Sequence, residues 1–409
     1  MVLPLLAVGM LAVIGAVGLS VDVGHAFLNK TRLQNALDST ALSGARTLML
    51  TSDVAAAEAD ARDVFKAHLD DGMSGLDVDA LVLQYSDTLM PFVGGGADPR
   101  YVRAALEGFP SILSFAAVLP NVDGSMTVAA TAVAGPAPLG HPAAGKTCDL
   151  APLMVCGSSG DTDCSDGACF GYDIGSRTEY EFGLRSGIDG VSLDAPLVVS
   201  ADCGEGSVYH DCVPMPGGVG APGNALLHEL GCDGNGCIRK GLAGSSEVCS
   251  TGGSVASVDP DGAPGPALEG LSTRFAVETS PLSSAVYPPD VVLAGRDDDV
   301  DYWYDEYRRD VASIIAAGSS AEGIPYRRVL TVPVVSCGGG EEDGVNRVLG
   351  FLCLFLSRVV DAKKARFYGQ FVTRCEASGE RAASVPAMSG NYVGPFDIVL
   401  YKDPDSHDS

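Results

Sequence analysis

The sequence predicts an α+β fold, in which a long N-terminal transmembrane helix leads into a small module of helices and strands, followed by a disulfide-rich, mainly β second domain. The first observation is that Met1–Val21 contain no charged side chain. The second is the abundance of glycine (51) and proline (24), which favours turns and strands over a helical bundle. The third is that all 12 cysteines lie at or after Cys148, so any disulfide framework belongs to the second domain.

The first helix is predicted over residues 1–50, as a membrane anchor that continues into an amphipathic half. About 20 uncharged residues in a helix rise about 30 Å, the thickness of the hydrocarbon core of a bilayer. Helix-forming residues continue from Asp22 to Leu50 without proline. Asp22 is interpreted as the point where the helix leaves the membrane for water. One apolar stripe with the period of a helix follows the second half, at Ala26, Leu33, Leu37, Ala41, Gly44 and Leu48.

The anchor carries a predicted helix-packing face. Ala12, Ala16, Ser20 and Gly24 recur every four residues and therefore lie on one side of the helix. Small residues at this spacing let helices approach closely where burial of apolar surface gives no advantage over lipid. The alternative is that alanine and glycine are simply abundant in this segment.

A cleaved secretory signal is the alternative interpretation of the uncharged stretch. Such signals carry a basic leader, a shorter apolar core and a small-residue cleavage site. No Lys or Arg precedes the run, and helix-forming sequence continues through the region of cleavage, so we favour a retained anchor. The positive-inside rule would place Lys30, Arg32 and Arg46 in the cytoplasm. The cysteines require an oxidising compartment and place the chain after the anchor in the periplasm or outside the cell.

Two motifs in the first helix resemble a known family. Val21–Gly24 form a V-D-x-G element, and Arg32–Ala45 read RLQNALDSTALSGA. Both resemble the N-terminal region of TadE/TadG-like Flp pilus-assembly proteins. The resemblance implies a pilin-like module of two helices and a small antiparallel sheet, with the sheet packed on the second half of the first helix. The segment MTVAATAVAG, which starts at Met126, resembles the strand that closes this module in the family.

The resemblance extends at lower specificity into the second domain. Cys148–Cys156, Pro222–Asn224, Thr273–Phe275 and the strand leading into Cys337 are similar to the longer TadG-like members. The Asp-x-Ser-x-Ser motif of a von Willebrand-type metal site is absent. The chain therefore resembles a TadG-like member without a von Willebrand-type domain.

The elements after the first helix define the expected domain boundaries. Residues 51–135 form the pilin-like module, residues 136–147 a linker rich in Gly and Pro, residues 148–402 the Cys-rich domain and residues 403–409 a tail. Ser52 or Asp53 is expected to cap a second helix over Val54–Leu69. The other elements predicted in the module are the strands Val78–Tyr85, Tyr101–Ala105 and Met126–Ala134 and a short helix over Ser111–Ala117.

The Cys-rich domain is predicted to be mainly β. The run VLGFLCLFLSRVV, which starts at Val348, is too short and too close to charged residues for a second membrane span, so we predict a buried strand. Asp301–Ala317 has the pattern of a helix. The predicted strands are Thr178–Leu184, Val191–Val199, Arg327–Ser336, Val345–Val359, Ala365–Arg374 and Phe396–Lys402.

The spacing of the cysteines predicts disulfides rather than zinc ligands. Zinc sites present thiolates in tight pairs, whereas Cys148, Cys156 and Cys164 follow one another at wide intervals. We expect Cys164–Cys169 and Cys232–Cys237 to be local pairs. Cys353, alone in an apolar strand, is expected to be a free thiol, since free cysteine is often buried. The disulfide candidates are Cys148, Cys156, Cys164, Cys169, Cys203, Cys212, Cys232, Cys237, Cys249, Cys337 and Cys375.

Charge and motif content argue against catalysis and nucleic-acid binding. The chain has 52 acidic and 26 basic side chains, and its net charge of −26 repels phosphates. His228–Cys232 begins like a zinc-protease helix but has cysteine where the second histidine would stand. The acidic run from Asp297 to Glu306 is interpreted as a solvated helix start. We predict no catalytic residue, no metal or cofactor site and no small-molecule substrate.

The resemblance and the composition together predict a non-catalytic protein of the bacterial cell envelope. The expected role is a membrane-anchored minor pilin-like or accessory assembly protein of a Tad/Flp pilus, whose Cys-rich domain supplies either protein contacts or adhesion. Its expected partners are the inner membrane and pilus subunits or Tad assembly proteins. The alternative is a disulfide-rich surface adhesin or binding module that uses the same anchor independently of pilus assembly.

Overall fold

The computed structural model divides the chain into two compact units. Residues 1–136 together with 398–409 form the first unit, and residues 137–397 form the second. The structure describes residues 2–70, 76–112, 125–139, 146–158, 164, 167–185, 224–227, 234–244, 249–254, 264–277, 282–294, 302–318, 322–336, 347–360, 366–380, 388 and 390–404. Within α1, the side chains of residues 2–9, 11, 12 and 14 lie outside this description.

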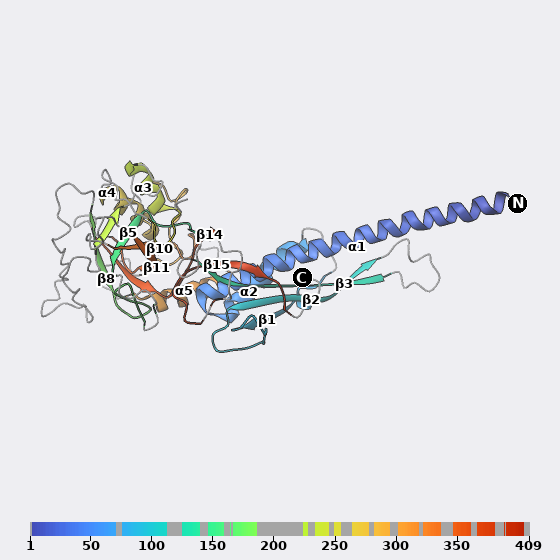
Figure 1. Cartoon of the computed structure of the whole chain (residues 1–409), viewed down its shortest axis with the longest axis horizontal. Coiled ribbons are helices and arrows are strands. Elements are labelled where there is room, and N and C mark those ends of the chain that lie inside the picture. Colours follow the sequence, from blue (N-terminus) through green and yellow to red (C-terminus); the bar gives the residue numbers. More distant parts are fainter. Residues whose placement is uncertain are drawn as a thin grey trace. The chain divides into compact units, whose positions relative to one another are not determined.

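The first unit begins with the predicted long helix. α1 runs without interruption over Val2–Thr51 (Figure 1). A tight turn follows, with Ser52 at a φ of 55°, and α2 covers Val54–Asp70. Asp53 caps α2, because its Oδ1 accepts hydrogen bonds from the amides of Ala55 at 2.8 Å and Ala56 at 3.2 Å.

No helix among the described residues is long and apolar enough to span a membrane. The anchor predicted over Met1–Val21 falls largely on residues whose side chains lie outside the described part of α1.

The sheet of the first unit has the strand order β1-β2-β3-β15. β1 (Val82–Ser86), β2 (Tyr101–Ile112) and β3 (Ser125–Pro138) are antiparallel neighbours, with Ser86 opposite Tyr101 and Val102 opposite Ala134. The first predicted strand starts four residues late, because Val78–Ala80 form a 3₁₀ turn, η1, capped by the carboxylate of Asp77. The short helix expected from Ser111 is wrong at its start, since Ser111 and Ile112 belong to β2. Residues 113–117 lie outside the described chain.

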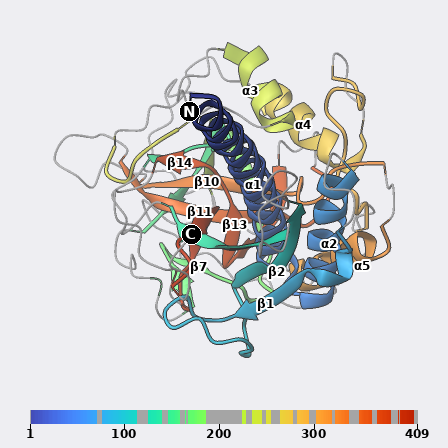
Figure 2. The same cartoon turned by 90° about the vertical axis from the view of Figure 1, so that its right-hand side faces the viewer.

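The core of the first unit lies between the second half of α1, α2 and the sheet (Figure 2). The predicted apolar stripe is confirmed, because Leu33, Leu37, Ala41 and Leu48 are at most 1% exposed. Gly44 lies close to both α2 and the sheet: a Cβ there would lie 3.2 Å from Ala61 Cβ of α2 and 3.4 Å from Val102 Cγ1 of β2.

The C-terminal strand corrects the expected domain boundary. β15 covers Gly394–Tyr401, and its residues from Ile398 onward belong to the first unit, although residues 148–402 were expected to be one domain and 403–409 a tail. β3 also extends to Pro138, into the expected linker. The physical reason is that β15 pairs with β3, a strand more than 250 positions earlier, and strand composition does not encode such a distant partner.

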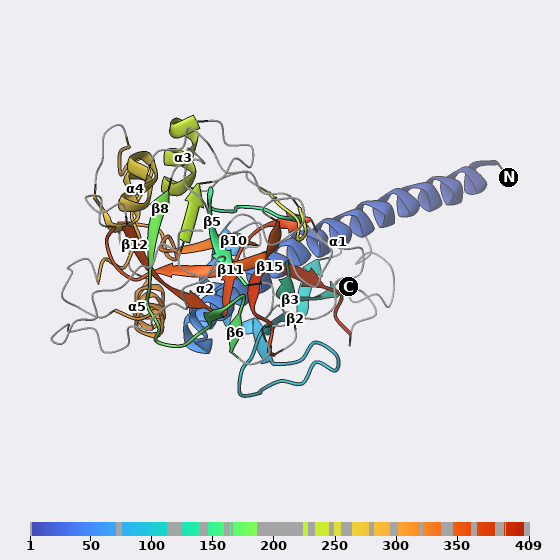
Figure 3. The ribbon, with the colours of Figure 1, turned by 60° about the vertical axis from the view of Figure 1, so that its left-hand side comes forward.

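The second unit is built on a closed barrel with the strand order β10-β11-β12-β8-β9-β5 (Figure 3). Its strands are β5 (Leu153–Gly157), β8 (Tyr180–Arg185), β9 (Asn224–Leu227), β10 (Val329–Ser336), β11 (Val348–Leu356) and β12 (Arg366–Val372). The pairs β10–β5 and β8–β9 are parallel and the other neighbours antiparallel. β11 is buried as predicted. The strand expected at Val191–Val199 lies outside the described residues.

Short elements surround the barrel in the second unit. The helices are α3 (Gly234–Ala243), α4 (Pro264–Ser272), the 3₁₀ turn η3 (Thr273–Phe275) and α5 (Tyr304–Ala316), which confirms the predicted helix near Asp301–Ala317. The remaining strands are β4 (Lys146–Thr147), β6 (Ala168–Cys169), β7 (Tyr172–Asp173), β13 (Arg374–Glu376) and β14 (Gly379–Glu380). An aromatic cluster fills part of the core, formed by Tyr172, Tyr180, Phe182, Phe367 and Phe371.

Candidate functional site

The environment of α1 changes near Leu28. From Leu33 onward one face of the helix is buried in the first unit, whereas large apolar side chains before that point are exposed. We call residues 10–28 the apolar segment. Its exposed large apolar side chains are Met10, Val13, Val17, Leu19, Val21, Val23, Phe27 and Leu28, with exposed fractions from 40% to 68%. A run of exposed apolar residues of this length marks a surface that contacts lipid or another protein.

The predicted packing face lies on this segment. Ala16, Ser20 and Gly24 are exposed, and a Cβ at Gly24 would meet nothing within 4 Å. Ser20 Oγ donates a hydrogen bond to the Val17 carbonyl at 2.9 Å, so its hydroxyl is satisfied within the helix. The side chain of Ala12 lies outside the described residues. The face is exposed at these three positions, and its use in helix packing stays a prediction.

A second face of the same segment is buried, and it continues the predicted apolar stripe from Ala26 toward the N-terminus. Gly18, Asp22 and Ala26 follow one another at intervals of four, and all three are buried. Asp22 is 3% exposed. The interpretation that Asp22 marks an exit into water is therefore wrong. Only a tertiary contact can bury a carboxylate on a helix whose adjacent positions, Val21 and Val23, are exposed.

Disulfides brace the second unit, and among the described residues there is no free cysteine. Cys148–Cys249 joins positions 101 residues apart, and the predicted local pair Cys164–Cys169 is present. Cys156 and Cys237 are also disulfide-bonded. Four candidates lie outside the described residues: Cys203, Cys212, Cys232 and Cys337. Because Cys232 is one of them, the expected pair Cys232–Cys237 stays a prediction.

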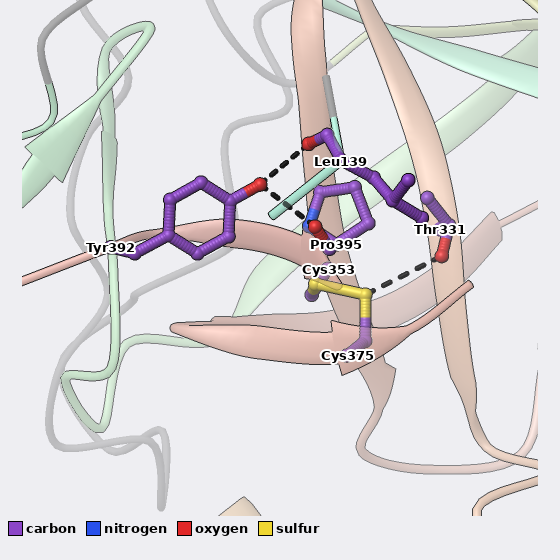
Figure 4. The surroundings of a disulfide bond; sticks show 6 residues. All are labelled: Leu139, Thr331, Cys353, Cys375, Tyr392 and Pro395. Atoms are coloured by element: carbon purple, nitrogen blue, oxygen red, sulfur yellow. Dashed lines mark hydrogen bonds between the residues drawn. A yellow bond between two sulfur atoms is a disulfide. The ribbon is translucent and has the colours of Figure 1, made fainter. Parts of the chain in front are cut away.

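The prediction that Cys353 is a free thiol is wrong. Cys353 in β11 pairs with Cys375 in β13 across a Cα–Cα distance of 5.6 Å, and both side chains are at most 2% exposed (Figure 4). Thr331 of β10 lies beside the bridge, with Oγ1 3.4 Å from Cys375 Sγ. The sequence identified the apolar strand correctly. The partner of Cys353 follows from the arrangement of the strands, which the apolar pattern does not determine.

The chain enters and leaves the second unit at neighbouring points. The Leu139 amide donates to the Pro395 carbonyl at 2.9 Å, and the Tyr392 hydroxyl donates to the carbonyls of both Leu139 and Pro395, at 2.5 and 2.7 Å (Figure 4). Burial raises the pKa of Tyr392, which keeps this hydroxyl protonated as a donor. The hydrogen bonds of the Leu139 amide and carbonyl therefore hold the entering and leaving segments together.

Among the described residues of the second unit, Arg328 is the largest side chain that is fully buried. Its guanidinium donates to the carbonyls of Leu356 at 2.9 Å, Ala294 at 2.6 Å and Ser357 at 2.6 Å. Burial lowers its pKa to about 10. The guanidinium carbon also lies 4.6 to 5.6 Å from the centres of four aromatic rings, those of Phe275, Tyr302, Tyr307 and Phe355.

A buried carboxylate completes this network. Asp290 is 0% exposed and accepts hydrogen bonds from the Tyr307 hydroxyl at 2.6 Å and from the Val292 and Arg328 amides at 2.9 and 3.1 Å. Burial raises the pKa of Asp290, and these hydrogen bonds and the charge of Arg328 oppose the rise. Because the guanidinium N–H groups of Arg328 donate to backbone carbonyls of the same unit, the network stabilises the unit rather than binding a ligand.

The sequence motifs with chemical associations do not form a site in the described part of the chain. No group of three or more His, Cys, Asp or Glu residues suited to a metal ion occurs there. His228–Cys232 and Asp297–Asp299 lie outside the described residues. Asp305, in the first turn of α5, is half-exposed and pairs with Arg177 at 2.8 Å.

The comparison with protein families agrees with the motifs of the first helix. Residues 1–47 match the model of the family described as "Putative Flp pilus-assembly TadE/G-like". From Val2 onward the match lies within α1, and it includes the apolar segment and most of the buried stripe. No curated protein and no solved structure matches the chain.

Proposed function

We propose that this chain, whose residues 1–47 are TadE/G-like, is a membrane-anchored minor pilin-like or accessory assembly protein of a Tad/Flp pilus, without catalytic activity. The observation that carries the proposal is that the two halves of α1 have different surroundings. Its second half is built into the core of the first unit, and its apolar segment exposes large side chains from Met10 to Leu28. A helix that exposes large apolar side chains over this length is suited to lipid or to other helices rather than to water.

The inner membrane holds the N-terminal part of α1 before assembly. Met1–Val21 carry no charge, and the length of such a segment in a helix matches the hydrocarbon core. The packing face of Ala12, Ala16, Ser20 and Gly24 then receives a helix of a pilus subunit or of a Tad assembly protein. The open space at Gly24 and the exposure of Ala16 and Ser20 support this assignment.

Both units stand on the oxidising side of the membrane. The three bridges between Cys148 and Cys249, Cys164 and Cys169, and Cys353 and Cys375 support a periplasmic or surface location in a bacterial envelope. The barrel unit supplies protein contacts or adhesion. The alternative function is that of an adhesin that uses the anchor without taking part in pilus assembly. The separate core and the disulfides of the barrel unit favour this alternative.

Pilus counts in a deletion strain separate these functions. The strain is complemented with the wild type, with the double variant Ala16→Leu/Ser20→Leu, or with the matched control Val17→Leu/Val21→Leu. The control also places leucine at two positions, but it adds only one methylene group to each side chain, and these side chains lie about 100° around the helix from the packing face. All three proteins should remain in membranes after alkaline carbonate extraction, since hydrophobicity rises in both variants.

We expect few or no surface pili with the packing-face variant and normal numbers with the control. Normal numbers with the packing-face variant would exclude this face as the contact. Normal pili but lost adhesion in the uncomplemented deletion strain would favour the adhesin function. Release of the full-length wild type by carbonate would exclude the anchor.

A further inference from the structure

The first unit is discontinuous in sequence, because its sheet is completed by the last residues of the chain. We propose that Ile398–Asp403, which we call the C-terminal clasp, must dock on β3 before the first unit is complete. The unit that carries the TadE/G-like helix then becomes stable only after the whole second unit has been made. This inference concerns folding and does not depend on the pilus role.

The clasp contributes to the core of the first unit. Ile398 packs against the core formed by α1, α2 and the sheet. The Tyr401 ring meets Tyr101 edge-to-face with centroids 5.8 Å apart, and Tyr101 is 1% exposed. The Tyr401 hydroxyl donates to the Pro136 carbonyl at 2.9 Å. Loss of the clasp would expose Tyr101 and remove a partner of Pro136.

A buried carboxylate anchors the end of the clasp. Asp403 is 3% exposed, and its two oxygens accept from different strands: Oδ1 from Arg103 Nη2 of β2 at 2.6 Å, and Oδ2 from Thr131 Oγ1 of β3 at 2.8 Å. Arg103 also lies over the Phe92 ring at 4.2 Å, which fixes the guanidinium in place. Asp403 therefore joins the two central strands, and removing it would leave Arg103 without this carboxylate in a largely buried position.

Removal of the clasp would change the topology of the sheet. In the order β1-β2-β3-β15, β3 is an interior strand with neighbours on both sides. Without β15 it becomes an edge that presents unpaired amides and carbonyls. Figures 1 and 3 show the red β15 beside β3, at the side of the sheet away from β1. An unprotected edge exchanges amide hydrogens faster and pairs with other chains.

The same strand is held by the disulfide-bonded part of the second unit. Its first residues pair in parallel with β13, with Cys375 opposite Pro395, and Cys375 is bridged to Cys353. The clasp is thus the direct continuation of a strand that the folded second unit holds.

Hydrogen exchange of the full chain in detergent, read by mass spectrometry, tests the proposal. One truncation removes residues 398–409. The matched control removes residues 404–409, which lie beyond the contacts of Asp403. We expect the first truncation to raise exchange in β2 and β3 by about tenfold or more, while the barrel strands stay protected, and the control to behave as the wild type. Excess synthetic peptide of residues 398–409 should restore protection.

Unchanged exchange of β3 after the first truncation would overturn the proposal. If that truncation also loosens the barrel, the full-length variant Tyr401→Ala/Asp403→Ala decides: selective deprotection of β3 supports the clasp, and wild-type protection overturns it. The oligomeric state is measured by light scattering in parallel. A wild-type oligomer that dissociates on truncation would show that the clasp docks on a second copy, which would overturn docking within one chain.

Discussion

Replacement of Arg328 by methionine should destabilise the second unit strongly. Methionine fills a similar volume but cannot donate to the carbonyls of Leu356, Ala294 and Ser357, which stay buried. Each buried carbonyl left without its donor costs about 1–3 kcal/mol, so the three together cost about 6 kcal/mol. Burial lowers the pKa of Arg328 to about 10, which corresponds to a net cost of about 3 kcal/mol for the charged form that the neutral side chain relieves.

The hydrogen-bond loss therefore exceeds the relief, and we expect the free energy of unfolding to fall by about 3 kcal/mol or more. The buried Asp290 also loses a compensating positive charge, which acts in the same direction. Guanidinium unfolding followed by the fluorescence of Trp303, the single tryptophan of the chain, reports on this unit. Its neighbour Tyr302 contacts the guanidinium of Arg328.

The matched control is Arg309→Met. Arg309 is exposed and pairs with Asp305 at 3.5 Å, a surface ion pair that contributes at most about 1 kcal/mol. If Arg328→Met unfolds within 1 kcal/mol of the control, roughly the worth of one hydrogen bond, then the buried guanidinium does not hold these carbonyls in the way described.

Three further predictions concern other parts of the chain. Gly44→Leu should lower the stability of the first unit by about 1–3 kcal/mol or more through overpacking, whereas Gly24→Leu should not, because nothing lies within 4 Å of that Cβ. Equal proteolytic resistance of the two variants would contradict this. Cys353→Ser/Cys375→Ser should cost about 3 kcal/mol of unfolding free energy, since the bridge closes a separation of 22 residues, and an unchanged Trp303 transition would refute it. Burial raises the pKa of Tyr180 to about 12, so the unfolded chain loses this proton first as pH rises above 10. The unfolding free energy that the neutral phenol contributes is present below pH 10 and is lost as the pH rises toward 12. Tyr180→Phe should therefore lose less stability over this pH range than the wild type. Parallel alkaline unfolding curves of the two proteins would show that the phenol does not contribute.

Much of the first helix could be predicted from the sequence, because its signals are local. The stripe of Leu33, Leu37, Ala41 and Leu48 has the period of the helix that contains it, and each of these residues is buried. The motif at Arg32–Ala45 lies within the segment that matches the TadE/G-like family. Cys164 and Cys169 are close enough along the chain that their pairing needed little knowledge of the fold.

The same reasoning holds for β11 and α5. The run from Val348 is continuously apolar, which a strand buried on both sides requires, and β11 has buried side chains almost throughout. Asp305 and Glu306 in the first turn of α5 indicate the start of this helix, because carboxylates there interact favourably with the positive end of the helix dipole. Both elements carry their own pattern within a dozen or so residues.

Tertiary structure alone decided the partners of distant segments. Phe396–Lys402 has the composition of a strand, but composition does not say that its end completes a sheet begun at Val82. The burial of Asp22 and the pairing of Cys353 with Cys375 also depend on contacts between segments that are separated in sequence. Helix periodicity is a property of one segment, whereas strand pairing, disulfide pairing and the burial of a charge are properties of two, and the second segment is chosen by the folded core as a whole.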